Sequence, residues 1–79
     1  MSKSFFEVHE NYTYSEIEAV ANKENMEVQR FGKIQIGQGF LLAYHRNVRL
    51  AYSFILIRAL DSDLLYSCVS ETVQDSITL

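Results

Sequence analysis

The fold is decided by residues 40–60, FLLAYHRNVRLAYSFILIRAL, an apolar run that is interrupted near its centre by Arg46 and Asn47. Asparagine tolerates a positive φ, so this dipeptide predicts a tight two-residue turn between two antiparallel strands. The run is also rich in β-branched and aromatic side chains, which favour strands. The stretch therefore predicts a central β-hairpin, around which the rest of the chain can be placed.

A two-residue turn fixes which residues lie opposite each other across this hairpin. It places Tyr44 opposite Arg49 and Tyr52 opposite Leu41, so the two tyrosines fall on opposite faces. Tyr44 and Arg49 would then form an exposed cation–π pair worth about 0.5 to 1 kcal/mol. The near-repeat of Ala-Tyr in this stretch is therefore first a feature of a hairpin tip.

Both faces of the predicted hairpin are apolar. One face carries Leu41, Ala43, Val48, Leu50, Tyr52, Phe54 and Leu56, and the other carries Phe40, Leu42, Tyr44, Arg49, Ala51, Ser53, Ile55 and Ile57. A single helix can cover one face of a small sheet but cannot cover both. The pattern therefore predicts either a partner on the second face or a second helix that covers it internally.

Two segments fit more than one secondary structure. Residues 49–60 also have an approximate helical spacing of large apolar side chains, although their composition favours a strand by propensity. After a turn at residues 61–63, the segment 63–73 is poor in helix formers and predicts a final strand over 64–70, while Ser62 could instead cap a helix. We take both segments as strands and keep the helical alternative open.

The N-terminal half predicts a strand followed by a helix. Residues 4–9 contain two aromatic residues and a valine before a turn-prone pair, which favours a short first strand. Ser15 and Glu18 have the spacing of a capping box, so we expect a helix to begin there, with Ile17 and Ala21 facing inward. Weak helix formers predict that this helix frays by about residue 25.

The segment between the helix and the hairpin predicts two further strand pieces. One begins at Met26 and ends at a glycine turn around Gly32, and a second includes Ile34 and Ile36. Residues 37–39, GQG, then make a turn or bulge. All elements together predict an α+β fold, a small antiparallel β-sheet of about four to five strands with one α-helix from the N-terminal half packed on one face, in which residues 1–79 form a single domain.

Length and composition limit the class of protein. A chain of 79 residues buries only about 60% of the surface that it exposes when unfolded, so its stability margin is thin. No apolar run approaches the roughly 18 to 20 residues of a membrane span, and Glu7 and Glu10 interrupt any secretory signal. The lone Cys68 cannot form an internal disulfide. We therefore expect a cytoplasmic protein that binds no membrane.

The charges are segregated along the chain. Residues 1–27, 28–60 and 61–79 carry formal net charges of −4, +5 and −4, which add to the total of −3, and the middle third contains no acid at all. An antiparallel sheet could lay the acidic flanks beside the basic centre and neutralise it. The alternative is a basic surface patch at the hairpin.

No constellation predicts catalysis, a cofactor or a metal. His9 and His45 are far apart in sequence, and Cys68 lies in an apolar run where a free thiol behaves as a small hydrophobic side chain. A single sheet with one helix also offers little depth for an active-site pocket. We therefore expect no enzyme, no cofactor and no catalytic or metal-binding residue.

Protein binding accounts best for an apolar hairpin between charged flanks, because uncovered apolar surface usually marks an interface. The candidate partner-binding residues are Glu16 and Glu27 on an acidic helix face, and Tyr44, His45, Arg46 and Arg49 at the hairpin tip. This profile is similar in class to small acidic stoichiometric inhibitors, such as phage-encoded inhibitors of host defence or transcription. The expected partner is a protein, including a nucleic-acid-binding protein or complex, or a second copy in a homodimer.

Nucleic-acid binding is the alternative function. Arg30, Lys33, Arg46 and Arg49 alternate with aromatic residues, and sheet surfaces hold single strands by stacking and phosphate contacts. A chain with pI near 5.2 lacks the basic composition typical of such domains, which makes nucleic acid the weaker expectation.

Overall fold

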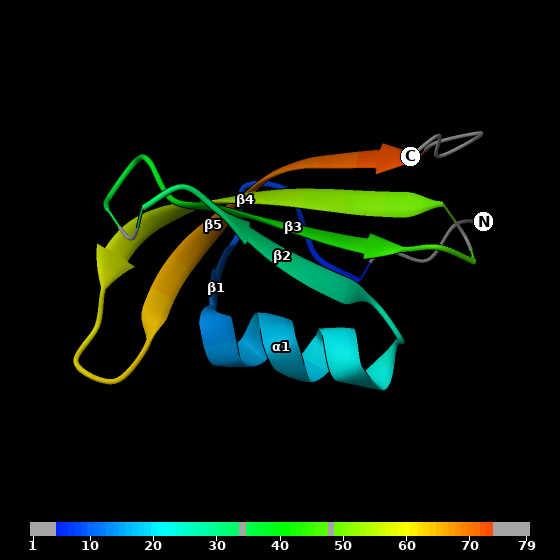
Figure 1. The fold of residues 1–79 in the computed structure, drawn as a ribbon, viewed down its shortest axis with the longest axis horizontal. Coiled ribbons are helices and arrows are strands. Elements are labelled where there is room, and N and C mark those ends of the chain that lie inside the picture. The colour runs from blue at the N-terminus through cyan, green and yellow to red at the C-terminus, as the bar shows by residue number, and fades with distance from the viewer. Residues whose placement is uncertain (1–4, 34, 48, 74–79) are drawn as a thin grey trace.

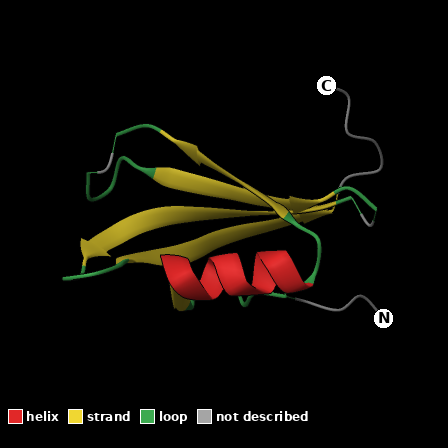
Figure 2. Cartoon of the chain, turned by 60° about the horizontal axis from the view of Figure 1, so that its bottom comes forward, coloured by secondary structure: helices red, strands yellow, loops and turns green. Residues whose placement is uncertain are grey.

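A computed structural model describes residues 5–33, 35–47 and 49–73, and it has the predicted α+β fold. The described residues form one antiparallel sheet in the order β1-β5-β4-β3-β2, with a single helix against one of its faces (Figures 1 and 2). The elements are β1 (Asn11–Thr13), α1 (Tyr14–Lys23), β2 (Glu27–Phe31), β3 (Phe40–His45), β4 (Leu50–Ala59) and β5 (Leu64–Val73).

The central hairpin is present, but its register differs from the predicted one by two residues. His45 lies opposite Leu50 and Tyr44 opposite Ala51, so the loop spans residues 46–49 in place of the two-residue turn. Arg49 adopts a φ of 51° and donates its N–H to the carbonyl of Arg46 at 3.4 Å, which closes this longer loop. The predicted pairing of Tyr44 with Arg49 is therefore wrong.

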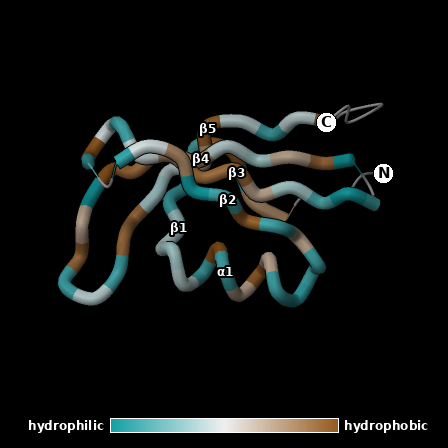
Figure 3. The backbone as a smooth tube through the Cα atoms, in the orientation of Figure 1, coloured by the Kyte–Doolittle hydropathy of each residue, from teal (hydrophilic) through white to brown (hydrophobic). Residues whose placement is uncertain are grey.

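The assignment of residues to the two faces survives this error, because a shift of two residues keeps the alternation of the side chains. Six of the residues predicted for one face are buried on the helix side of the sheet: Leu41, Ala43, Leu50, Tyr52, Phe54 and Leu56. Ile17 and Ala21 of α1 contribute to the same core. Figure 3 shows apolar segments along β3, β4 and α1. Tyr44 and Tyr52 lie on opposite faces, as predicted.

The helix begins two residues earlier than the sequence predicts. Thr13 is the N-cap, its Oγ1 accepts from the Glu16 N–H at 3.2 Å, and its own N–H donates to Glu16 Oε1 at 2.9 Å. Thr13 still pairs with Leu65 of β5, so the chain turns directly from the sheet into the helix and the cap must lie at this point. The predicted capping box of Ser15 and Glu18 is therefore wrong.

Within the described chain, no helix is long and apolar enough to cross a membrane.

The first strand is also displaced from its predicted position. Of the residues 4–9 expected to form it, those from 5 onward form no strand, and residue 4 lies outside the described part. The strand is Asn11–Thr13, in which Tyr12 lies opposite Tyr66. Phe6 instead inserts into the core and is 2% exposed. Its aromatic side chain signalled burial, and burial here requires no strand.

Residues 32–39 form a loop in place of the predicted second strand piece, and Ile34 itself lies outside the described residues. Gly37 has a φ of 81° and donates its N–H to Leu56 O at 2.8 Å, while Gly39 O accepts from Leu56 N–H at 2.9 Å. The loop thus folds back onto β4.

The strands predicted at 49–60 and 64–70 are confirmed, so the helical alternatives are wrong, and β5 extends to Val73.

Candidate functional site

The candidate site is the face of the sheet that α1 does not cover, which we call the open face. Its strand residues alternate with those of the helix side and include Glu27, Gln29 and Phe31 of β2; Phe40, Leu42 and Tyr44 of β3; Ala51, Ser53 and Ile55 of β4; and Ser67, Ser70 and Thr72 of β5. Figure 2 shows the one helix of the described chain on the other side of the sheet. The described chain places no helix over the open face, and Tyr44 and Ala51 are nevertheless buried within it, whereas Phe31 and Phe40 are exposed.

One end of the open face carries an exposed aromatic pair. Phe31 and Phe40 lie opposite each other on neighbouring strands, and their rings stack at 5.0 Å between centroids with 21° between planes. Phe31 is 38% exposed and Phe40 45% exposed. Ile55 lies opposite Phe40 on β4 and is half-buried. These side chains form an apolar surface that the described chain leaves uncovered.

The other end of the open face carries a polar cluster of Glu27, Tyr44 and Arg46. The Tyr44 hydroxyl donates to Glu27 Oε2 at 2.7 Å, and Arg46 Nη2 donates to the same hydroxyl at 3.4 Å. Arg46 Nη2 also lies 3.7 Å from Glu27 Oε2, and its guanidinium carbon lies 5.9 Å from the centroid of the Tyr44 ring. The cation–π partner of Tyr44 is thus Arg46, where the sequence predicted Arg49.

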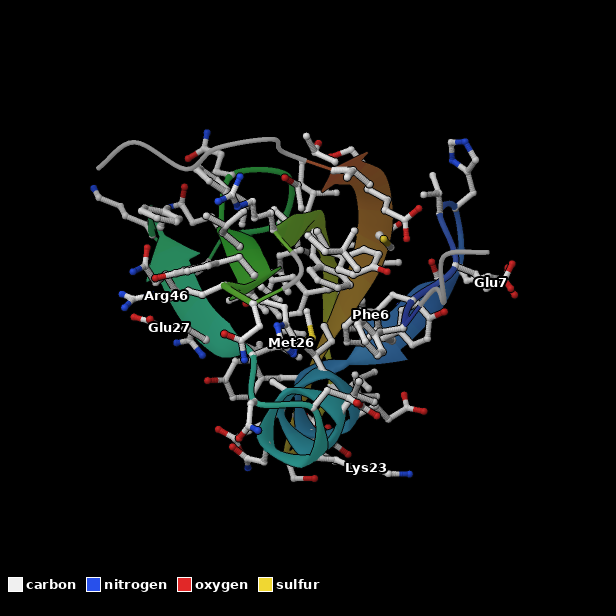
Figure 4. The ribbon with its side chains drawn as sticks, turned by 90° about the vertical axis from the view of Figure 1, so that its right-hand side faces the viewer. Phe6, Glu7, Lys23, Met26, Glu27 and Arg46 are labelled. Atoms are coloured by element: carbon white, nitrogen blue, oxygen red, sulfur yellow. The ribbon has the colours of Figure 1, made fainter. Side chains whose placement is uncertain are left out.

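This cluster borders a shallow depression of about 320 Å³, which is lined by Asn25, Glu27, Tyr44, Arg46 and Asn47. In Figure 4, Arg46 and Glu27 lie next to each other, across the molecule from Glu7. The hydrogen bond from Tyr44 is the largest cause that holds the pKa of Glu27 below its usual value, followed by the bond from Gln29. The hydrogen bond with Tyr44 likewise raises the pKa of Arg46. Glu27 and Arg46 are therefore both charged and largely neutralise each other.

The six candidate residues from the sequence are only partly brought together. Glu27, Tyr44 and Arg46 meet in the polar cluster, and Arg49 lies exposed in the adjoining β3–β4 loop. His45 points to the helix side, where its ring stacks on Phe5 at 6.2 Å, and its Nδ1 is buried without a hydrogen-bond partner among the described residues.

The predicted acidic helix face does not form. Glu16 closes the capping box of α1, whereas Glu27 lies on β2 and points to the open face. The sequence placed both on one helix because it extended the helical period beyond Lys23, where α1 in fact ends. The left-handed φ of 58° at Asn25 turns the chain into β2 and separates the two carboxylates.

The stacking of Phe31 on Phe40 was not predicted. The sequence offered a signal, because both residues fall on the apolar second face by alternation. Their contact depends on the register between β2 and β3, and the predicted strand piece at 34–36 would have placed another strand between them. The aromatic end of the open face is therefore a product of the loop over residues 32–39.

The basic middle third of the chain does not form one patch. Arg46 and Arg49 lie at one end of the sheet, whereas Arg58 is opposite Leu65 near the other end. Arg30 projects to the helix side, where its guanidinium lies 5.0 Å from the Tyr14 ring centroid. Within the described ranges, the ion pair between Arg46 and Glu27 is the only one. The strand alternation and the hairpin geometry distribute these bases over both faces and both ends.

Cys68 lies on the helix side of the sheet. Cys68 is fully buried, which raises the pKa of its thiol, and its Sγ lies 3.9 Å from Ser70 O. No group of three or more metal-binding side chains occurs among residues 5–33, 35–47 and 49–73.

A scan against protein-family models and searches of curated proteins and of solved structures returned no match to this chain.

Proposed function

We propose that this chain is a non-catalytic protein-binding module that docks onto its partner through the open face. The observation that carries this proposal is the stacked pair of Phe31 and Phe40, which are 38% and 45% exposed on a face that no helix of the described chain covers. The solvated face of an antiparallel sheet usually carries polar side chains, so two stacked phenylalanines on such a face indicate a surface that binds a partner. An exposed apolar patch bordered by polar side chains is the usual mark of a protein interface.

The energy available from this surface is substantial for so small a chain. Two phenylalanines of about 200 Å² each, exposed to the extents given above, offer roughly 160 Å² of apolar surface. At about 25 cal/mol per Å², their burial contributes about 4 kcal/mol toward binding. Leu42 and Ile55 beside them add further half-exposed apolar surface. The open face thus has the aromatic anchors that dominate the energetics of interfaces.

The form of action that we propose is stoichiometric inhibition or modulation of a larger protein machine, including one that handles nucleic acid. The charge distribution supports this form. Glu10, Glu16 and Glu18 are exposed on the N-terminal segment and α1, away from the open face. A partner bound to the open face would therefore display a new acidic surface, which repels anionic ligands nearby.

The test is affinity capture from native host lysate with three immobilised chains: wild type, Phe40→Glu and Ala19→Glu. Ala19 is exposed on α1, so its replacement adds the same charge on the opposite side of the molecule. We expect a protein to co-purify with wild type and with Ala19→Glu, and to be lost with Phe40→Glu. Equal recovery by all three chains would show that the open face is not the docking surface.

Binding of single-stranded nucleic acid is the second candidate function, and the stacked pair of Phe31 and Phe40 also favours it. Exposed aromatic rings on a sheet can stack on bases at about 1–3 kcal/mol per base. Tyr52, another aromatic residue near the bases of the middle third, is fully buried. Fluorescence anisotropy with a labelled oligothymidine separates the two functions. If the affinity for the oligothymidine falls steeply with salt concentration and is lost in Phe31→Ala, the result would support nucleic-acid binding.

A further inference from the structure

We propose that the open face binds a second copy of this chain, so that two sheets pack face to face in a two-fold homodimer. This inference rests on the proposed function, because it assumes that the open face is a protein interface. In such an interface the same patch is used by both copies, so the patch must be compatible with itself. The size, the charge and the residue distribution of the open face meet this requirement.

The area of the open face is sufficient for a stable pair. Five strands about 4.8 Å apart span roughly 24 Å. The strands have three to ten residues, and at about 3.3 Å per residue they are roughly 10 to 33 Å long, so the face has an outline of about 540 Å². Stable interfaces bury about 600 to 1,000 Å² per partner, and the pleated surface exceeds its flat outline.

The charge of the open face permits self-association, although each chain carries a net charge of −3. Glu27 is the only acid among the described strand residues of this face, and Arg46 lies 3.7 Å from it. The remaining members of the face are apolar, amide or hydroxyl side chains. Two such faces meet without opposing uncompensated carboxylates. By contrast, the acidic helix sides would repel each other if they met.

The two ends of the open face complement each other under a two-fold axis that runs across the strands. This axis lays the aromatic end of one copy, with Phe31 and Phe40, over the polar end of the other copy. Arg58, which is opposite Leu65 near the aromatic end, then lies over the end of the partner copy that holds Glu27, two strands away from that residue. Aligned packing of two twisted sheets is a common arrangement in β-sandwiches.

The resulting dimer has four layers, with both sheets inside and both helices outside. Its inner layer buries the apolar residues of the open face, including Phe40, Leu42 and Ile55. The carboxylates of Glu16 and Glu18 stay in solvent on the two outer surfaces. The second apolar face of the central hairpin is thus covered although the described part of the chain has one helix.

Sedimentation equilibrium of the full chain, from micromolar to millimolar concentration, tests the inference. We expect wild type and Ala19→Glu to be dimers, and Phe40→Glu to dissociate about 100-fold or more readily, because each substitution occurs twice in a two-fold interface. Phe40→Lys is the second variant and should dissociate similarly, which excludes an effect of the added negative charge. Circular dichroism confirms that the variants fold.

Two results would overturn the inference. One is a wild-type chain that is monomeric throughout the concentration range. The other is a dimer that persists in both Phe40 variants, which would place the contact elsewhere, for example at the free edge of β2. A monomer that still captures a partner through Phe40 would refute the dimer and leave the proposed function standing. A dimer lost in the Phe40 variants, with no other protein captured, would support the dimer and restrict the function to self-association.

Discussion

At the residue scale, the Tyr44 hydroxyl controls the charge at the polar end of the open face. It donates to Glu27 Oε2 at 2.7 Å, and this bond is the largest cause that lowers the pKa of Glu27 from 4.5. The charged carboxylate accepts the bond, so the folded state binds this proton less tightly than the unfolded state. The stabilisation is therefore present above pH 4.5 and is lost as the pH falls through the lowered value.

We predict that Tyr44→Phe raises the pKa of Glu27 toward 4.5, as measured by a carboxyl chemical-shift titration. Arg46→Gln is the matched comparison and should raise the pKa less, because the Coulombic effect of Arg46 is the smallest of the contributing causes. A larger change with Arg46→Gln would mean that the ion pair, and not the hydroxyl, holds this carboxylate charged.

Tyr52 performs the corresponding role on the helix side, where its side chain is fully buried. Its hydroxyl donates to Glu71 Oε2 at 2.5 Å and accepts from the Phe5 N–H at 2.9 Å. Burial is the largest cause that raises the pKa of Tyr52 from 10.0 to about 12, and the hydrogen bond to Glu71 is the second largest. The neutral phenol is favoured in the folded state, so its contribution is complete below pH 10 and is lost as the pH rises through about 12.

We therefore expect the free energy of unfolding to fall between about pH 10 and pH 12, and to fall less steeply in Tyr52→Phe. Urea denaturation at several pH values measures both slopes. The comparison with Tyr52→Phe is needed because other side chains also titrate in this range, among them Tyr66, whose pKa burial raises as well. Identical slopes for the two chains would contradict the prediction.

At the element scale, the start of α1 is set by its junction with β1. Thr13 is both the last residue of β1 and the N-cap of α1, so one side chain couples the end of a strand to the first turn of the helix. We predict that Thr13→Ala destabilises the protein by about 1 kcal/mol in chemical denaturation, since it removes the hydroxyl that accepts from Glu16 N–H.

Glu18→Ala is the control for this helix cap, because Glu18 is exposed and has no part in the observed capping box. Its replacement should change the stability by no more than about 0.5 kcal/mol. A larger loss of stability with Glu18→Ala than with Thr13→Ala would indicate that the helix is capped at Ser15, as the sequence predicted.

At the scale of the whole molecule, Phe6 joins the N-terminal segment to the sheet. Its ring packs edge to face against Tyr12, Tyr52 and Phe54, with centroids 5.2, 5.1 and 5.0 Å away. We predict that Phe6→Ala costs about 3 to 5 kcal/mol in urea denaturation. This is a large share of the roughly 4 to 12 kcal/mol expected for a domain of this size.

Val8→Ala is the control for Phe6→Ala, because Val8 lies in the same segment but is 37% exposed. It should change the stability by about 0.5 kcal/mol or less. If both substitutions have the same small effect, the N-terminal segment contributes little to the core. If the dimer forms as proposed, all these measurements depend on protein concentration and should be compared at one concentration.

The sequence by itself determined the α+β class, the central hairpin and the division of its residues between two faces. Local periodicity is sufficient for this division, since the side chains of a strand alternate whatever its register. Leu41 and Phe54 are buried and Phe40 is exposed even though the predicted turn was two residues too short. Tyr44 and Arg46 were predicted together at the hairpin tip, whereas Glu27 was predicted on a helix face and lies on β2.

Only the tertiary structure decided the details that create the candidate site. Pairing of residues 11–13 with β5 moved the helix cap to Thr13, and the loop over residues 32–39 brought Phe31 against Phe40. The end of α1 at Lys23 separated Glu16 from Glu27, which then met Tyr44 across two strands. These outcomes depend on contacts between segments far apart in the chain, whose energies exceed local propensity and leave no periodic signal in the sequence.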